Sequence, residues 1–261
     1  LPHLREGTAV KGIDVSQWQG EIDWAAVKAG GVAFAMLRAS VGTAADSRFA
    51  QYAAGAASAG IPIGAYHYLT STTAAGAKRE AAFFLSQLAG KRLECPAVLD
   101  LEEPNQLALP DGELMSLAEA FLAAVEEAGY YAMLYASLST LQRLQGAVPE
   151  RLARYDLWCA RWGAGEPGIS CGIWQYEVSK AGAVPGVSTD CDRDLAYKDY
   201  PFLIQAAGLN HLEETEDTGK DLAALRQELL ETKAQLTQVQ AEKEDILRRL
   251  RALVEEYGET K

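Results

Sequence analysis

Eight short apolar segments, separated in the first half by stretches of helical periodicity, constrain the fold of this chain more than any other feature. The segments predicted as strands are residues 12–16, 32–40, 62–69, 96–102, 131–137, 155–161, 171–177 and 191–196. Helices are predicted at residues 23–31, 46–60, 72–90 and 110–129, each of which ends in glycine, a common helix stop. Alternating strands and helices imply a parallel sheet, and about eight strands in ~200 residues predict a barrel of the TIM kind.

The helices thin out after the fifth predicted strand, so the barrel is expected to be irregular in its last third. The predicted fold class is therefore α/β, an irregular TIM-like barrel with about eight strands and five helices, followed by a long C-terminal helix. The domain boundary is placed where the composition changes: residues 1–210 form the barrel domain and residues 211–261 a helical tail without Pro, Trp or Phe.

The tail carries a heptad pattern that predicts a coiled coil. Apolar and neutral positions alternate at spacings of three and four, with one lysine in the seam: Leu222, Leu225, Leu229, Thr232, Leu236, Val239, Lys243, Ile246, Leu250, Leu253 and Tyr257. We expect residues 220–257 to mediate a homo-oligomer, with Lys243 fixing register or strand number. The alternative is a single amphipathic helix that lies on the barrel.

Two carboxylates stand in a strand that is otherwise apolar. Asp100 and Glu102 are two residues apart, so they project from the same face of the strand, and Leu99 and Leu101 project from the other. If the leucines pack under helices, the acids point to the barrel axis near the C-terminal end of the strand, where barrel enzymes keep their catalytic groups. Mutual repulsion there raises one pKa and suits an acid and base that divide the work. Hydrogen bonding at the strand exit is the structural alternative.

Two other strands also carry acids. Asp14 lies in the first strand and Asp192 in the last, and because these strands are neighbours in a closed barrel we expect the two to lie close together. Asp190 and Asp194 flank Asp192 and are alternatives for its position. A ring of carboxylates with aromatic neighbours is typical of glycoside hydrolysis, which needs a proton donor and a second carboxylate.

The sequence resembles the glycoside hydrolase family 25 lysozymes, muramidases that cut peptidoglycan. The matching stretches run in order over residues 11–200: KGIDVSQWQG (11–20), FAMLRASVG (34–42), GAYHY (64–68), LDLE (99–102) and IWQY (173–176). The resemblance implies cleavage of the β-1,4 bond between N-acetylmuramic acid and N-acetylglucosamine, with retention or inversion left open.

The same resemblance implies a role for each acid. Glu102 would be the general acid, and Asp100 would hold the 2-acetamido group or the developing positive charge. Asp14 and Asp192 would complete the pocket and orient water or substrate. The chain departs from the family at the last strand, where Cys-Asp-Arg-Asp (residues 191–194) replaces the usual Val-Asp-Leu-Asn.

Other polar and aromatic residues are candidates for substrate binding. Tyr66, Tyr135 and Trp174 fall near strand ends, where sugar rings stack on aromatic faces and a phenol can donate a hydrogen bond. Arg38 lies in an apolar strand and is expected to pair with the aspartate cluster, or else to extend to the rim. His67 alternates with Tyr66 and is expected in the core.

Composition limits the partners. The formal net charge is −12, which argues against a nucleic-acid groove or an anionic-membrane patch, and no apolar run reaches the roughly 20 residues needed to span a bilayer. Three scattered histidines and four cysteines without a C-x-x-C motif predict no metal site, no cofactor and free thiols.

The expected partner is therefore the peptidoglycan glycan strand, and the expected location is extracellular or at the cell wall, although the first residues show no export signal. The alternative function is a non-catalytic wall-binding or assembly module, oligomerised by the tail.

Overall fold

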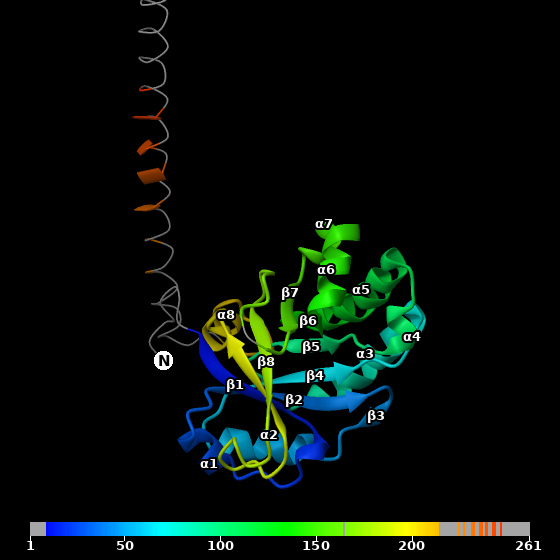
Figure 1. Ribbon diagram of the computed structural model, residues 1–261, viewed down its shortest axis with the longest axis vertical. Coiled ribbons are helices and arrows are strands. Elements are labelled where there is room, and N and C mark those ends of the chain that lie inside the picture. The colour runs from blue at the N-terminus through cyan, green and yellow to red at the C-terminus, as the bar shows by residue number, and fades with distance from the viewer. Residues whose placement is uncertain are drawn as a thin grey trace, which may run out of the picture. The chain divides into compact units, whose positions relative to one another are not determined.

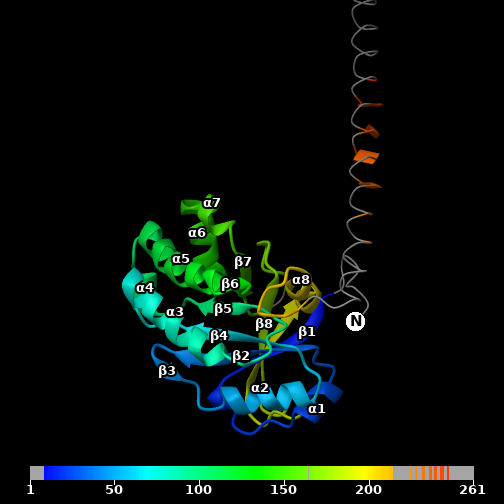
Figure 2. The ribbon, with the colours of Figure 1, turned by 180° about the vertical axis from the view of Figure 1, so that it is seen from behind.

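The structure is a computed structural model that describes residues 9–163 and 165–213, together with single helical positions between residues 224 and 246. Contacts divide the chain into two units, Leu1–Glu213 and Glu214–Lys261. Figures 1 and 2 show the first unit from two sides, with its helices around the outside of the strands.

The first unit is an eight-stranded barrel. Its strands are β1 (Val10–Val15), β2 (Phe34–Val41), β4 (Ile63–Tyr68), β5 (Ala97–Asp100), β6 (Ala132–Ser137), β7 (Asp156–Ala160), β8 (Ile173–Ser179) and β9 (Cys191–Ala196). They follow one another around the barrel in chain order, and β1 closes it by pairing with both β2 and β9. A two-residue strand, β3 (Ala44–Ala45), adds to the end of β2. All eight predicted strands are present, so the predicted α/β fold with an irregular TIM-like barrel is confirmed.

The expectation of a wholly parallel sheet is wrong for the last strand. Strand β9 is antiparallel to β8 and to β1, whereas the other neighbouring barrel strands pair in parallel. The reason lies in the connection of residues 180–190, which contains no helix. Without a crossover helix the chain turns back on itself, and a returning strand pairs antiparallel.

The helices lie where periodicity predicted them, and others join them. The structure has α1 (Trp24–Ala29), α2 (Phe49–Ser58), α3 (Ala74–Leu88), α4 (Pro104–Leu107), α5 (Asp111–Glu127), α6 (Leu138–Ala147), α7 (Pro149–Leu152), α8 (Tyr200–Ala206) and a short 3-10 helix, η1 (Gln17–Gln19). Helix α6 was not predicted; Ser137 caps it by accepting from the Thr140 amide, and Leu141 and Leu144 are buried. Between β7 and β9 the described residues contain no helix, which gives the irregular last third.

Two apolar cores hold the barrel together. The larger lies between the strands and the helices, where Phe84 of α3 contacts Phe121 of α5 with ring centroids 5.7 Å apart. The smaller fills the inside of the barrel and includes Phe34, Met36 and Trp158. A Cβ atom at Gly12 would overlap the Phe34 ring. The glycine in β1 therefore leaves the space that this ring occupies inside the barrel.

Only part of the tail can be described. The described seam positions, Thr232, Leu236, Val239, Lys243 and Ile246, are helical, and all of them are exposed. The remaining positions of the predicted coiled coil lie outside the described residues, so the coiled coil stays a prediction. Within the residues that can be described, no helix combines the length and apolar character needed to cross a bilayer.

Candidate active site

A polar cavity of about 260 Å³ opens at the C-terminal ends of the parallel strands. It is lined by Asp14, Ser16, Trp18, Gln19, Arg38, Tyr66, Tyr68, Asp100, Glu102, Tyr135, Trp158, Gln175 and Asp192. We call it the acidic cavity, because four of these side chains are carboxylic acids. A second cavity, of about 190 Å³, lies at the other end of the strands and has mostly apolar walls.

The strand pairing brings the four predicted acids together. Asp14 of β1 lies directly opposite Asp192 of β9 in the antiparallel register, as expected for neighbouring strands. Asp100 is the last residue of β5, and Glu102 follows just beyond the strand. Acids from the two ends of the sequence thus meet acids from its middle at one end of the barrel.

The structure distinguishes the three aspartates of the last strand. Asp192 lines the acidic cavity. Asp190 is exposed, accepts from the Ala181 amide and lies 3.6 Å from the Lys180 ammonium. Asp194 is 0% exposed and does not line the cavity.

Burial dominates the electrostatics of the acids. Removal from water raises the pKa of Asp14 and of Asp100 well above the usual range; the Asp194 and Asp192 charges add to the effect on Asp14, and Glu102 adds to that on Asp100. Burial raises the pKa of Asp192 to about 6. Charged forms are disfavoured in such a site, so it retains protons at a pH where exposed carboxyls have lost them.

Glu102 has the most accessible of these carboxyl groups. The residue is exposed at the mouth of the cavity. The surrounding protein nevertheless excludes enough water to raise its pKa, and the charges of Asp192 and Glu103 raise it further. An accessible carboxyl with a raised pKa can deliver a proton to a bound molecule.

Gln175 is hydrogen-bonded to two residues that line the acidic cavity, Asp14 and Tyr135, and to Trp162. Its Nε2 donates to Oδ2 of Asp14 at 2.8 Å, and its Oε1 accepts from the Tyr135 hydroxyl and from Nε1 of Trp162, each at 3.1 Å. These contacts fix the amide orientation, because the oxygen receives two donors and the nitrogen faces a carboxylate. The sequence analysis did not identify Gln175. It alternates with Trp174 along the strand, so only one of the two side chains can point into the barrel, and this alternation was the available signal.

Trp174 does not line the acidic cavity, contrary to expectation. Its Nε1 donates to the Arg161 carbonyl at 2.8 Å, and its ring contacts Tyr176. Neighbouring residues of a strand point to opposite faces, so the inward position of Gln175 turns Trp174 outward. The tryptophans at the cavity are instead Trp158, which is buried, and Trp18, whose side chain is 71% exposed at the rim.

Tyr66 and Tyr135 line the cavity and enclose Trp158. Their ring centroids lie 5.9 Å and 4.7 Å from the Trp158 ring, both in edge-on geometry. Burial raises the pKa of both phenols well above the usual range, so both hydroxyls are protonated donors.

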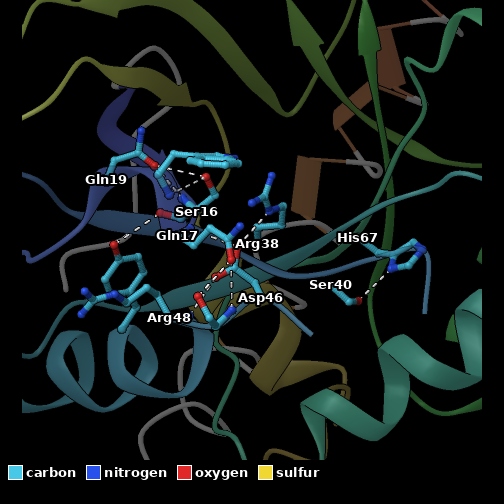
Figure 3. Close-up of polar contacts among 11 residues, drawn as sticks. Ser16, Gln17, Gln19, Arg38, Ser40, Asp46, Arg48 and His67 are labelled. Atoms are coloured by element: carbon cyan, nitrogen blue, oxygen red, sulfur yellow. Dashed lines mark hydrogen bonds and ion pairs between the residues drawn. The ribbon is translucent and has the colours of Figure 1, made fainter. Parts of the chain in front are cut away.

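Arg38 reaches the cavity but has a different partner from the one expected. Its Nε lies 2.9 Å from Oδ2 of Asp46, which also accepts from the Gln17 amide, while Oδ1 accepts from the Arg48 amide (Figure 3). The prediction that Arg38 pairs with the aspartate cluster is therefore wrong for its direct contact. Its positive charge still lowers the pKa of Asp100, against the larger effect of burial.

His67 lies on the other face of β4, as expected. It is fully buried, with Nδ1 2.8 Å from the Ser40 hydroxyl and Nε2 2.9 Å from a Glu80 carboxyl oxygen. Figure 3 shows the Ser40–His67 pair apart from the residues around Arg38. The His67 ring stacks on the Phe121 ring with centroids 5.0 Å apart, so His67 belongs to the core.

The described residues hold no group of histidine, cysteine and acidic side chains able to bind a metal ion. Cys95, Cys159, Cys171 and Cys191 are all free thiols, and burial raises the pKa of each. None is therefore a thiolate nucleophile at neutral pH.

Comparison with known proteins gives consistent matches. The model of glycosyl hydrolases family 25 matches residues 13–187. Lysozyme M1 of Streptomyces globisporus is 33% identical over 202 residues, covering 72% of this chain and 67% of that protein. The autolytic lysozyme of Clostridium acetobutylicum is 29% identical over 186 residues, or 71% of this chain, but the match spans little more than half, 55%, of that relative.

A solved structure agrees with these sequence matches. The bacterial lysozyme from Streptomyces coelicolor superimposes with a TM-score of 0.63 at 32% identity. The match covers 72% of this chain and 92% of that one.

Proposed function

The chain belongs to glycosyl hydrolase family 25, and from that premise we propose that it hydrolyses peptidoglycan as a lysozyme-type muramidase. The bond cleaved is the β-1,4 linkage between N-acetylmuramic acid and N-acetylglucosamine, and Glu102 is the general acid. The observation that carries this proposal is the position of Glu102, an accessible carboxyl with a raised pKa at the mouth of a cavity lined by three further acids.

Glu102 protonates the glycosidic oxygen as the bond to the leaving sugar breaks. A general acid must hold its proton at the working pH and still reach the substrate. Burial around Glu102, with the charges of Asp192 and Glu103, supports the first requirement, and its exposure supports the second. This division between a protonated acid and neighbouring carboxylates is general in glycoside hydrolysis.

Asp100 faces the sugar that becomes positively charged. It is 5% exposed, and its Oδ1 accepts no hydrogen bond from the described residues. A buried acceptor without a partner suits the N–H of a 2-acetamido group, or the oxocarbenium-like charge that develops next to it. Burial favours the neutral form of Asp100, and a positive charge that develops next to it favours the ionised form.

Asp14 and Asp192 complete the pocket on the opposite wall. They lie side by side through the β1–β9 register, and Oδ1 of Asp192 also has no partner among the described residues. We assign them the orientation of water or substrate. Tyr66 and Tyr135 add hydroxyl donors, Arg38 adds a cation, and the exposed Trp18 ring offers a surface on which a sugar can stack.

The test is hydrolysis of purified bacterial cell walls by the full chain. The unchanged protein should clear the suspension and release new reducing ends that carry N-acetylmuramic acid. Glu102→Gln keeps the size of the side chain but removes the proton, so hydrolysis should fall at least about a hundredfold. Glu127→Gln, an exposed site at the end of α5, should leave the rate unchanged.

Two results would contradict the proposal. One is unchanged hydrolysis by Glu102→Gln, which would show that Glu102 is not the general acid. The other is binding of the unchanged protein to cell walls without any new reducing ends, which would favour a wall-binding module instead.

We further propose that the chain acts at the cell wall and self-associates through residues 220–257. The described seam positions support self-association, because Leu236, Val239 and Ile246 are each more than half exposed: 57%, 59% and 58%. Large apolar side chains repeated at spacings of three and four along a helix are stabilised when a second helix covers them.

A further inference from the structure

A fifth acid, Asp194, lies beneath the acidic cavity. It follows Asp192 by two residues on β9, so both side chains point into the barrel. In the sheet register it lies between Gly12 of β1 and Gln175 of β8. It is 0% exposed, so no solvent reaches its carboxyl group.

One oxygen of Asp194 has a donor and the other has none. Nε1 of Trp158 donates to Oδ1 at 2.8 Å. Oδ2 accepts no hydrogen bond from the described residues. Asp14 lies opposite Asp192 in the β1–β9 register, two residues before Asp194, so the side chains of Asp14 and Asp194 project from the same face of these paired strands. Two ionised carboxyl groups offer only acceptors, so a hydrogen bond between them requires a proton.

The groups around this pair are mostly acids, phenols and a thiol rather than cations. The titratable and charged groups that face it are Asp192 and Cys191 from β9, Asp100 from β5, Tyr66 from β4, Tyr135 from β6 and Arg38 from β2. Arg38 is the cation of this set, and it is already paired with Asp46 at 2.9 Å. Nothing in the set neutralises a second negative charge on the pair.

We propose that Asp194 is a positioning residue that shares one proton with Asp14, so that the two carboxyl groups together carry a single negative charge. The proposal rests on the proposed function, because the group it positions is the Asp14 carboxyl of that site. Burial and the neighbouring acids raise the pKa of both residues well above the usual range, which agrees with a retained proton.

The shared proton holds Asp14 from below while Gln175 holds it from the side. Nε2 of Gln175 donates to Oδ2 of Asp14 at 2.8 Å, so the carboxyl group of Asp14 is fixed between two donors. Asp194 also anchors the Trp158 indole, whose ring lies against Tyr66 and Tyr135. One buried acid thereby orients an acid and three aromatic side chains of the cavity.

The test compares Asp194→Asn with Asp194→Leu in the full chain. Asparagine keeps the acceptor for Trp158 and offers an N–H to Asp14 in place of the shared proton. Hydrolysis by Asp194→Asn should therefore stay within about threefold of the unchanged enzyme. Leucine has a similar size but no polar atoms, so its hydrolysis should fall at least about tenfold.

Two further measurements report the proton itself. The infrared difference spectrum between the unchanged protein and Asp194→Asn at neutral pH should show the loss of a protonated carboxyl C=O stretch. The unfolding free energy of the unchanged protein should fall as the pH rises above about 4, the pKa of an unfolded aspartate. This fall should be smaller in Asp194→Asn, because the amide does not titrate.

Two outcomes would overturn the proposal. A folded Asp194→Asn that loses as much hydrolysis as Asp194→Leu would mean that the site needs an ionised carboxylate there. An infrared spectrum without a lost protonated carboxyl would mean that the pair shares no proton. Both physical measurements are made without substrate, so they stand even if the unchanged protein fails to hydrolyse cell walls.

Discussion

Gln175 donates a hydrogen bond of 2.8 Å to Asp14, and this contact joins β8 to β1 across the intervening strand β9. The two residues are 161 positions apart in the chain. The same amide accepts from Tyr135 on the far side of the cavity, so Gln175 couples two walls of the site.

The first prediction concerns this contact. Gln175→Met keeps a side chain of similar length but removes the donor to Asp14, leaving a buried oxygen without its partner. Hydrolysis of cell walls should fall between about tenfold and a hundredfold while the thermal unfolding remains cooperative. Glu177→Gln, on the same strand but exposed, serves as the control and should keep the rate. An unchanged rate in Gln175→Met would mean that Asp14 is oriented without it.

The second prediction concerns the pH dependence of stability. Burial raises the pKa of Asp192 to about 6, whereas the unfolded value is about 3.9. The fold therefore favours the protonated form: the stabilisation is complete below the unfolded pKa and is lost as the pH rises through the folded one. Urea unfolding should show a smaller loss of stability between about pH 4 and pH 7 in Asp192→Asn than in the unchanged protein.

Asp190→Asn is the matched control for that experiment. Asp190 lies two residues earlier, is exposed and does not line the cavity, so its substitution should leave the slope of stability against pH as it was. Equal slopes for all three proteins would show that Asp192 titrates in the folded chain as it does in the unfolded one.

The third prediction concerns the packing beneath the cavity. A methyl group at Gly12 would overlap the Phe34 ring inside the closed barrel. Gly12→Ala should therefore destabilise the protein by about 1–3 kcal/mol, as other overpacked cores do. The double variant Gly12→Ala with Phe34→Leu should recover part of this loss relative to Phe34→Leu alone, measured by urea unfolding. Additive losses would place the cause elsewhere than in this contact.

The fourth prediction concerns the tail. Sedimentation equilibrium of the full chain should show an oligomer, and Leu236→Glu combined with Val239→Glu should shift it to the monomer, because charges in the seam oppose helix pairing. Gln238→Glu adds a charge outside the seam and should leave the oligomer intact. A monomer at all concentrations for the unchanged chain would contradict self-association.

Local patterns were enough to find the elements of the barrel. Each predicted strand overlaps an observed one, because a short apolar run bounded by glycine or polar residues has few other places to lie than in a buried sheet. The alternation of Asp100 and Glu102 with leucines likewise predicted that both acids face the cavity, since side-chain direction in a strand follows from spacing alone.

Barrel closure predicted that Asp14 and Asp192 lie close together, but other contacts between distant strands could not be read from the sequence. The reversal of β9, the inward turn of Gln175 in place of Trp174, and the pairing of Arg38 with Asp46 each depend on how one strand or loop meets another. The sequence shows that side chains alternate along a strand. Which of the two alternating sets faces the barrel interior depends on the neighbouring elements against which the strand packs.

The sequence by itself therefore determined the barrel, its strand positions and the presence of acids at one end of it, because these follow from hydrophobic period and from spacing within single segments. Only the tertiary structure decided that Asp192 lines the cavity while Asp194 is fully buried. The physical reason is that the charge state of an acid depends on the water and the charges around it, and closure of the barrel brings these groups together from strands far apart in the chain.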